Sequence, residues 1–311
     1  MNLRRVEGAA AGARVGVFVG LVVAAIASWV AVVAGPGSAR AEAAGGAGEA
    51  AVLTFRAPAT APTALDLATL TRACGEQAIA VDDPYHGRRM QYRALLLRCV
   101  LEQGFAARGG AASLAAESVL LRARDGYTRS ASGASLADPH AFLAFGEVGL
   151  DAEGAAPRFS PIDRRQIDPA PFYLVWTDVA RGDPHEHPWP YQLVTIEVAR
   201  FEAAFPHTVP RDLAKADPGW RGYALFQASC SACHAINGEG GKVGPDLNVP
   251  RSIVEYRPIP QIRAYVRDPQ ATRYTSMPAH PGLSDADLDA LIAYFQAMSR
   301  RKHDPRAGGG S

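Results

Sequence analysis

The feature that most constrains this chain is the pentapeptide Cys230-Ser231-Ala232-Cys233-His234, which has the pattern C-x-x-C-H. Two thiols on one turn of backbone can bond to the same group, and the adjacent imidazole can ligate a metal from one side. A zinc site would need a second pair of ligands, and Cys74 and Cys99 are too far apart to form another C-x-x-C pair. A thioredoxin-like redox motif has no need of the histidine.

The pattern C-x-x-C-H is typical of covalent haem attachment. Each thiol adds to a vinyl group of the porphyrin, and the histidine lies beneath the iron as its proximal ligand. We therefore predict one haem c that is bonded to Cys230 and Cys233 and ligated by His234.

The segment Gly222-Tyr223-Ala224-Leu225-Phe226 precedes the motif, and its first and last residues lie on one helical face because they are four positions apart. With this segment, the region from about Asp217 to Ser299 resembles a class I c-type cytochrome. The resemblance implies an all-α domain over residues 213–302. It also implies that the first helix crosses the last one, with Leu291 and Tyr294 against Gly222 and Phe226.

The segment Gly244-Pro245-Asp246-Leu247 resembles the loop that follows the haem helix in this family. In the family, the proline carbonyl accepts a hydrogen bond from the proximal histidine, which fixes the orientation of the ring. By position, Pro245 takes this role towards His234.

The segment Tyr274-Thr275-Ser276-Met277-Pro278 resembles the loop that supplies the distal ligand in the family. Met277 is accordingly the candidate for the second axial ligand of the iron. A thioether is a soft, neutral ligand, so His/Met ligation favours reduced iron and raises the potential. His280 is the alternative, and it would give bis-His ligation with a lower potential.

The last helix is predicted to begin after Ser284, a good N-cap residue, with Asp285 and Asp287 in its first turn. Apolar residues then follow with helical spacing as far as Met298. A shorter helix is predicted over residues 262–267. Haem propionates could be bound by several residues between which the sequence does not decide: Arg257, Arg263, Arg273, Tyr256 and Tyr274.

The N-terminal segment, residues 1–41, has the pattern of an export signal. Basic residues precede an uncharged apolar run over residues 15–34, and Ala39-Arg40-Ala41 is an A-x-A cleavage site. We expect cleavage after Ala41, with retention of residues 15–34 as a membrane anchor as the alternative. Both interpretations place the body of the protein in the periplasm.

The length of 311 residues predicts two domains, and the net charge of +1 gives no basis for nucleic-acid binding. Residues 42–62 are rich in Ala, Gly and Pro and predict a flexible linker. Residues 303–311 predict a disordered tail.

Residues 63–210 predict a separate α+β domain. Helices are expected over residues 64–73 and 95–101, and Asp125-Gly126 predicts a hairpin turn. Strands are expected over residues 78–81, 89–94, 119–123, 141–145, 172–176 and 193–198. The segments Asp125-Gly126-Tyr127 and 172–176 faintly resemble the sulfite-oxidase-like, molybdopterin-binding domain. Cys74 and Cys99 do not match the molybdenum-ligating cysteine of that family, so the resemblance implies a similar shape without the metal.

Cys74 and Cys99 remain once two of the four cysteines are assigned to haem. An even pair in an oxidising compartment predicts a disulfide, with two buried free thiols as the alternative. Among the other residues, Tyr127, Trp176, Trp189 and Tyr191 are predicted to be packing aromatics.

Together these features predict a periplasmic electron carrier whose N-terminal domain docks a redox protein, either a dehydrogenase or an oxidase. The alternatives are the haem subunit of a periplasmic, molybdopterin-type dehydrogenase and a haem-based gas sensor. No catalytic residue is predicted.

Overall fold

The computed structural model describes residues 51–150, 157–162, 165–177 and 187–307. The predicted export signal and the alternative anchor over residues 15–34 lie outside these residues. Among the helices of the described part, none has both the length and the apolar character needed to cross a membrane.

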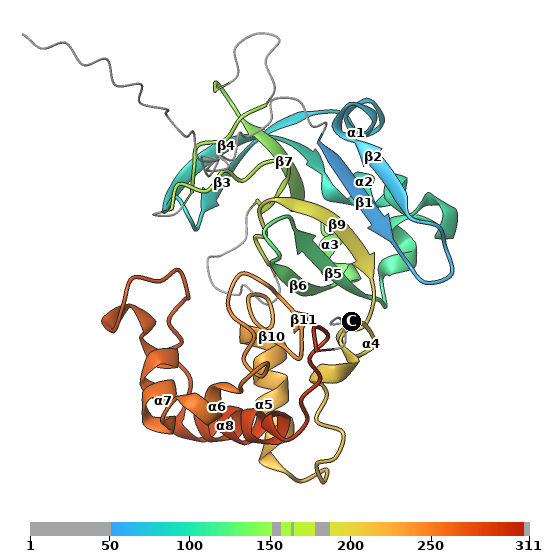
Figure 1. Ribbon diagram of the computed structural model, residues 1–311. Coiled ribbons are helices and arrows are strands. Elements are labelled where there is room, and N and C mark those ends of the chain that lie inside the picture. The colour runs from blue at the N-terminus through green and yellow to red at the C-terminus, as the bar shows by residue number, and fades with distance from the viewer. Residues whose placement is uncertain (1–50, 151–156, 163–164, 178–186, 308–311) are drawn as a thin grey trace, which may run out of the picture. The chain divides into compact units, whose positions relative to one another are not determined.

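The first sheet has five strands in the order β2-β1-β9-β5-β6 (Figure 1). Strands β1 and β9 are parallel, and the other neighbours are antiparallel. Their bounds are Thr63–Asp66 (β2), Val52–Arg56 (β1), Leu193–Val198 (β9), Ser118–Ala123 (β5) and Thr128–Ser132 (β6).

Strand β1 lies in the stretch for which the sequence predicts a linker. Its side chains alternate between exposed and buried, and Leu53 and Phe55 are fully buried. Two bulky apolar residues two positions apart give a strand one face to bury, even within an Ala- and Gly-rich stretch. The structure therefore differs from the predicted linker over Val52–Arg56.

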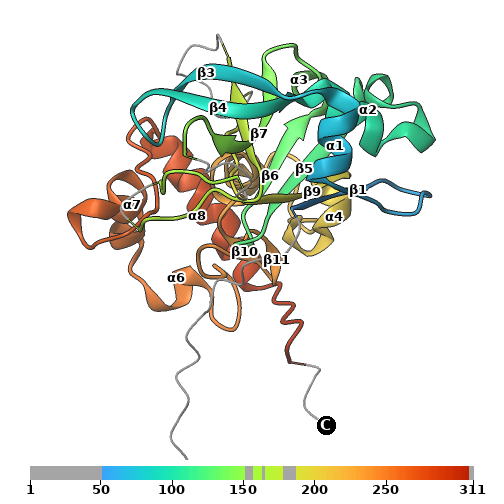
Figure 2. The same cartoon turned by 90° about the horizontal axis from the view of Figure 1, so that it is seen from above.

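The second sheet has four antiparallel strands in the order β3-β4-β7-β8. Their bounds are Gln77–Asp83 (β3), Arg88–Leu96 (β4), Ala141–Glu147 (β7) and Tyr173–Trp176 (β8). The long β3–β4 hairpin is seen in Figure 2. Each of these strands overlaps a strand predicted from the sequence.

Side chains from both sheets pack into one core together with helices α1 and α2. Phe55, Leu143 and Ile196 are each at most 1% exposed in this core. The helices and helical turns of this part are α1 (Leu67–Cys74), α2 (Leu97–Gly104), η1 (Ala106–Arg108), η2 (Ala111–Leu114), α3 (Gly133–Leu136), α4 (Phe201–Ala204) and η3 (Pro206–Thr208).

A disulfide joins Cys74 at the end of α1 to Cys99 in α2, with an S–S distance of 2.06 Å. The bridge ties two helices that also pack on the shared core. The oxidised pair in the native protein stays a prediction, which alkylation tests below.

The C-terminal part contains helices around the C-x-x-C-H motif. Their bounds are Pro218–Leu225 (α5), the π-helical turn Phe226–Cys230 (η4), Ile253–Tyr256 (α6), Ile259–Arg267 (α7), Pro269–Ala271 (η5) and Asp285–Ser299 (α8). Helix α8 begins with a complete capping box, in which Ser284 and Asp287 bond to each other's backbone N–H. Ser284 is the N-cap that the sequence predicts.

The predicted fold class, an α+β domain followed by a separate all-α domain, is wrong. The C-terminal part contains an antiparallel strand pair, Ala235–Ile236 (β10) and Glu239–Gly240 (β11), and long irregular segments over residues 241–252 and 272–284. The first of these segments carries two Gly and two Pro, and proline cannot donate the backbone hydrogen bond that a helix needs.

The order of the two parts agrees with the prediction, with sheets first and helices after them, but the two parts also pack against each other. Gly48–Ser311 forms one compact unit. Leu120 of strand β5 is buried in the same apolar cluster as Leu291 and Phe295 of α8. A strand of the first sheet thus contributes to the core around the last helix.

Candidate haem site

Helix α5 is followed by the π-helical turn η4, and the C-x-x-C-H motif begins at the last residue of this turn, Cys230. Asp217 caps the start of α5 by accepting a hydrogen bond from the N–H of Gly219 at 2.8 Å. At the other end, the N–H of His234 donates to the carbonyl of Cys230 at 2.9 Å, so the two cysteines and the histidine share one compact turn. Such π-helical turns occur frequently at functional sites.

Cys230 and Cys233 are both free thiols and both half-buried. Burial raises the pKa of Cys230 to about 12 and that of Cys233 to about 11. Both groups are therefore neutral thiols at neutral pH when no group is bound to them.

The imidazole of His234 is held by the loop that follows the motif. Its Nδ1–H donates to the carbonyl oxygen of Pro245 at 2.8 Å, which is the contact that the family resemblance implies. Burial lowers the pKa of His234. The ring is therefore kept neutral with Nε2 as its lone-pair nitrogen, which is the form that ligates iron.

Gly244 allows the loop to approach this ring. A Cβ at position 244 would lie 2.7 Å from Nδ1 of His234, closer than carbon and nitrogen can come without displacement. The loop is also bonded to the motif directly, because the N–H of Gly244 donates to the carbonyl of Cys233 at 2.7 Å. The chain thus builds one face of a haem site, and its residues fit that group.

Helices α5 and α8 cross at Gly222, as the resemblance implies. A Cβ on Gly222 would overlap the carbonyl oxygen of Ala290 and lie 2.8 Å from the Cβ of Tyr294. The rings of Phe226 and Tyr294 lie 5.5 Å apart at the same crossing. This close crossing fixes α8 against the helix that presents the cysteines.

Met277, the predicted distal ligand, lies half-buried in the irregular segment over residues 272–284. Its N–H donates to Oγ1 of Thr275 at 3.1 Å. His280, the alternative ligand, is also half-buried, and its N–H donates to the carbonyl of Val266 at 3.1 Å. The choice between the two ligands stays a prediction.

Two of the arginines considered for haem propionates have other partners. Arg263 forms ion pairs with Asp285 and Asp289 of α8. Arg273 donates to the hydroxyl of Tyr265 at 2.9 Å and lies over its ring. Of the tyrosines, Tyr274 is 93% exposed.

The turn between strands β5 and β6 contacts the motif, which the sequence did not indicate. The N–H of Thr128 donates to the carbonyl of Ala232 at 3.0 Å, and the N–H of Lys242 donates to the carbonyl of Gly126 at 2.9 Å. The buried side chain of Arg129 donates to the carbonyl of Ala228 at 2.6 Å. No local pattern predicts these contacts, because the partners are about a hundred residues apart.

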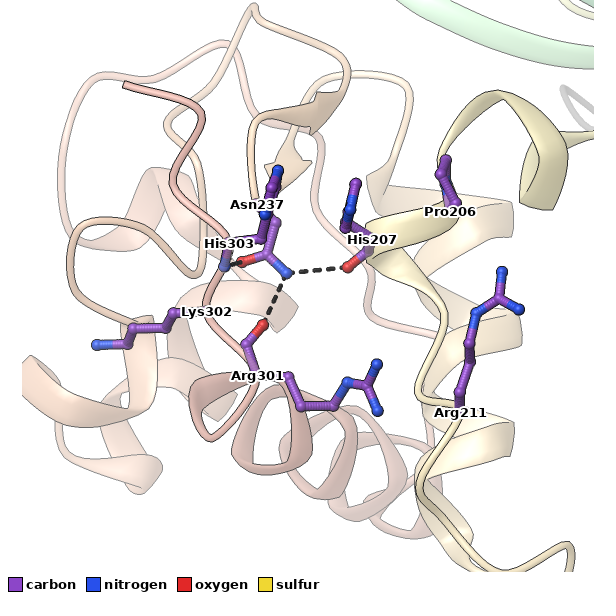
Figure 3. Close-up of a pocket in the computed structure, with 7 residues that line it drawn as sticks. All are labelled: Pro206, His207, Arg211, Asn237, Arg301, Lys302 and His303. Carbon is purple, nitrogen blue, oxygen red and sulfur yellow. Dashed lines mark hydrogen bonds between the residues drawn. The ribbon is translucent and has the colours of Figure 1, made fainter. Parts of the chain in front are cut away.

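A cavity of about 430 Å³ lies at the β10–β11 turn, outside the motif (Figure 3). Asn237 lies beside it and donates to the carbonyls of His207 and Arg301, both at 2.9 Å. The ring of His207 stacks on that of His303 at 3.8 Å. The residues that line the cavity are Pro206, His207, Arg211, Asn237, Arg301, Lys302 and His303.

The paired thiols, the oriented imidazole and the crossed helices form an arrangement that suits covalent attachment of a haem. Residues 220–299 match the family described as Cytochrome c. The chain therefore carries a cytochrome c domain. The match does not extend to residues 63–210, so their resemblance to the sulfite-oxidase-like domain stays a prediction.

The chain is also similar to cytochrome c oxidase subunit 2 of Alkalihalophilus pseudofirmus. The two are 35% identical over 86 residues, which is 25% of this chain and 25% of that protein. The chain thus spans about a quarter of the length of this relative.

Proposed function

We propose that the protein is a periplasmic c-type cytochrome that carries single electrons through one haem, bonded covalently to Cys230 and Cys233. The observation that carries this proposal is the geometry of the motif, in which two free thiols and a histidine oriented by Pro245 share one turn. The sequence contains one C-x-x-C-H motif, which supports one haem.

A bound haem would supply an iron atom that takes up and releases one electron. Residues of this chain would set the reduction potential of that iron. Pro245 fixes the imidazole of His234 and increases its basicity as a ligand. Met277 would offer a soft thioether that favours reduced iron, and a haem held by His234 and Met277 would exchange electrons instead of binding a substrate.

The periplasmic location is supported by the export pattern of residues 1–41 and by the pair Cys74–Cys99, which suits an oxidising compartment.

The part of the chain that forms the two sheets, strands β1 to β9, is here called the sheet region. It would dock a redox protein, either a dehydrogenase or an oxidase. The similarity to an oxidase subunit favours an oxidase, and it also supports a second candidate function, a cytochrome c domain that is part of an oxidase complex.

The proposal is tested with the full chain, produced in a bacterial host that matures c-type cytochromes. We expect one haem per chain that resists acid–acetone extraction, and the double variant Cys230→Ala/Cys233→Ala should lack it. Met277→Ala should lower the midpoint potential and change the visible spectrum, whereas His280→Ala should leave both unchanged. Colourless wild-type protein would contradict the proposal.

The two candidate functions are separated by purification of the native protein. A carrier should purify as a single chain that exchanges electrons with several partners. An oxidase component should remain bound to other subunits through detergent extraction and gel filtration.

A further inference from the structure

Tyr127 of the sheet region lies in the turn that is bonded to the motif, and Tyr191 and Tyr85 are linked to that turn; we call Tyr85, Tyr127 and Tyr191 the tyrosine face. Tyr127 lies in the β5–β6 turn, next to Thr128, whose N–H is bonded to the carbonyl of Ala232. Ala232 directly precedes Cys233 in the chain. Tyr127 is thus placed at the motif by backbone hydrogen bonds.

Tyr191 and Tyr85 are linked to this turn by a backbone hydrogen bond and a ring contact. The N–H of Arg124 donates to the carbonyl of Gln192 at 2.9 Å, which ties the residue after Tyr191 to the same turn. The rings of Tyr191 and Tyr85 lie 5.6 Å apart, edge to face. This spacing is typical of a favourable aromatic pair.

Tyr85 is held in place by a buried carboxylate at the β3–β4 turn. Asp83 is fully buried, and its Oδ1 accepts the N–H of Tyr85 at 2.8 Å. Its Oδ2 accepts the hydroxyls of Tyr92 and Tyr173 at 2.8 Å and 2.9 Å. A carboxylate with several donors at fixed positions gives this turn one conformation, so the ring of Tyr85 is presented by a rigid hairpin.

Tyr127 and Tyr85 differ in how far the protein covers them. Burial raises the pKa of Tyr127 to about 12, and Arg129 opposes the shift. Tyr85 keeps 46% of its surface exposed, so a bound group can still cover its ring.

We propose that the tyrosine face is a wall of the haem site, so that the porphyrin edge bonded to Cys233 lies against the sheet region instead of facing solvent. This proposal rests on the proposed function, because it needs a haem at Cys230 and Cys233. It assigns a second role to the sheet region, which completes the site and restricts the access of small redox molecules to that edge.

The test uses full-length protein whose haem content has first been shown to be one per chain, so a failure of haem attachment is recognised separately. The reduced protein is mixed with ferricyanide in a stopped-flow instrument. Tyr85→Ala should react several-fold faster than wild type, because removal of the ring opens the edge, and its midpoint potential should fall. Tyr85→Phe should react like wild type, because it keeps the ring.

Gln91→Ala is the matched control, since Gln91 is an exposed, neutral residue of the same hairpin. It should leave the rate and the potential unchanged. An equal change in Gln91→Ala and Tyr85→Ala would show a general effect on the hairpin and overturn the proposal. So would a Tyr85→Ala protein that reacts like wild type.

A second measurement is made on the wild-type protein. Holoprotein labelled with ¹³C-tyrosine gives a ring signal for Tyr85, and the variant Tyr85→Phe, which lacks this signal, serves only to assign it. This signal should shift between the ferric and ferrous states, because unpaired electron spin on a nearby iron displaces it. A signal at the same position in both states would place Tyr85 away from the haem and contradict the proposal.

Discussion

Nδ1 of His234 and the carbonyl oxygen of Pro245 lie 2.8 Å apart and form a hydrogen bond that orients the imidazole. The bond depends on the close approach of the loop, and Gly244 makes that approach possible because it has no side chain. The sequence around these residues therefore sets the orientation of the ring that would ligate the iron.

Gly244→Ala should disturb this geometry. The new methyl group would overlap the His234 ring and push it from Pro245. We expect a loss of about 1–3 kcal/mol in the free energy of unfolding and a lower yield of haem-loaded protein. Denaturant titration and the haem-to-protein absorbance ratio measure the two effects.

Gly282→Ala is its control, because a Cβ at Gly282 meets nothing within 4 Å. It should match wild type in both measurements. Equal haem yield in Gly244→Ala and Gly282→Ala would contradict the role of the loop.

Gly222→Ala should weaken the crossing of α5 and α8. The added Cβ would meet the backbone of Ala290, which cannot move without displacing α8. The expected loss is about 1–3 kcal/mol in the free energy of unfolding, measured by guanidinium titration followed by circular dichroism. Ala224→Ser, at an exposed position of the same helix, should cost less than half as much. A Gly222→Ala protein as stable as wild type, or more stable, would contradict the close crossing, because helix propensity alone favours alanine over glycine.

Asp287, in the first turn of α8, makes the free energy of unfolding depend on pH. Hydrogen bonds from Ser284 and Arg221 lower its pKa to about 2, from a value of 3.8. The carboxylate therefore stabilises the fold fully above pH 3.8, and this contribution is lost as the pH falls through about 2. Asp287→Asn should be less stable than wild type at pH 7.

The difference in the free energy of unfolding between wild type and Asp287→Asn should shrink as the pH is lowered from about 4 to about 2. Urea titrations at a series of pH values measure this difference. A difference that stays constant over this range would mean that the charge of Asp287 does not contribute. Gln296→Ala, at an exposed and uncharged position of the same helix, serves for comparison and should show no such change with pH.

The Cys74–Cys99 pair predicts two results. Alkylation of the unfolded protein without reductant should leave both cysteines unmodified, and modification of both would refute the bridge. Cys74→Ala/Cys99→Ala should lower the free energy of unfolding by about 3 kcal/mol, because the bridge closes a loop of 25 residues. The variant should keep its haem, since the pair is separate from the motif.

The sequence predicted the features that depend on neighbours in the chain. The N-cap at Ser284 and the turn at Asp125-Gly126 follow from local backbone chemistry, and both are present. The contact of His234 with Pro245 was available because a family pattern spans the eleven positions between them.

Features that depend on distant segments were missed. Strand β1 pairs with β2 and also with β9, which is about 140 positions away, and nothing within residues 42–62 indicates the distant partner. The bond between Thr128 and Ala232 is of the same kind. For this reason the sequence did not predict the contacts between the sheets and the motif, and Tyr127 and Tyr191 were expected to be packing aromatics.

Tyr294 joins the last helix to the segment that leads out of the sheet region. Its hydroxyl donates to the carbonyl of Thr208 at 2.8 Å, and both residues are completely buried. A swinging motion of one region about this segment would break a buried hydrogen bond and expose an aromatic ring. A haem bonded to the motif would accordingly keep one position relative to the sheets, and no moving tether would vary it.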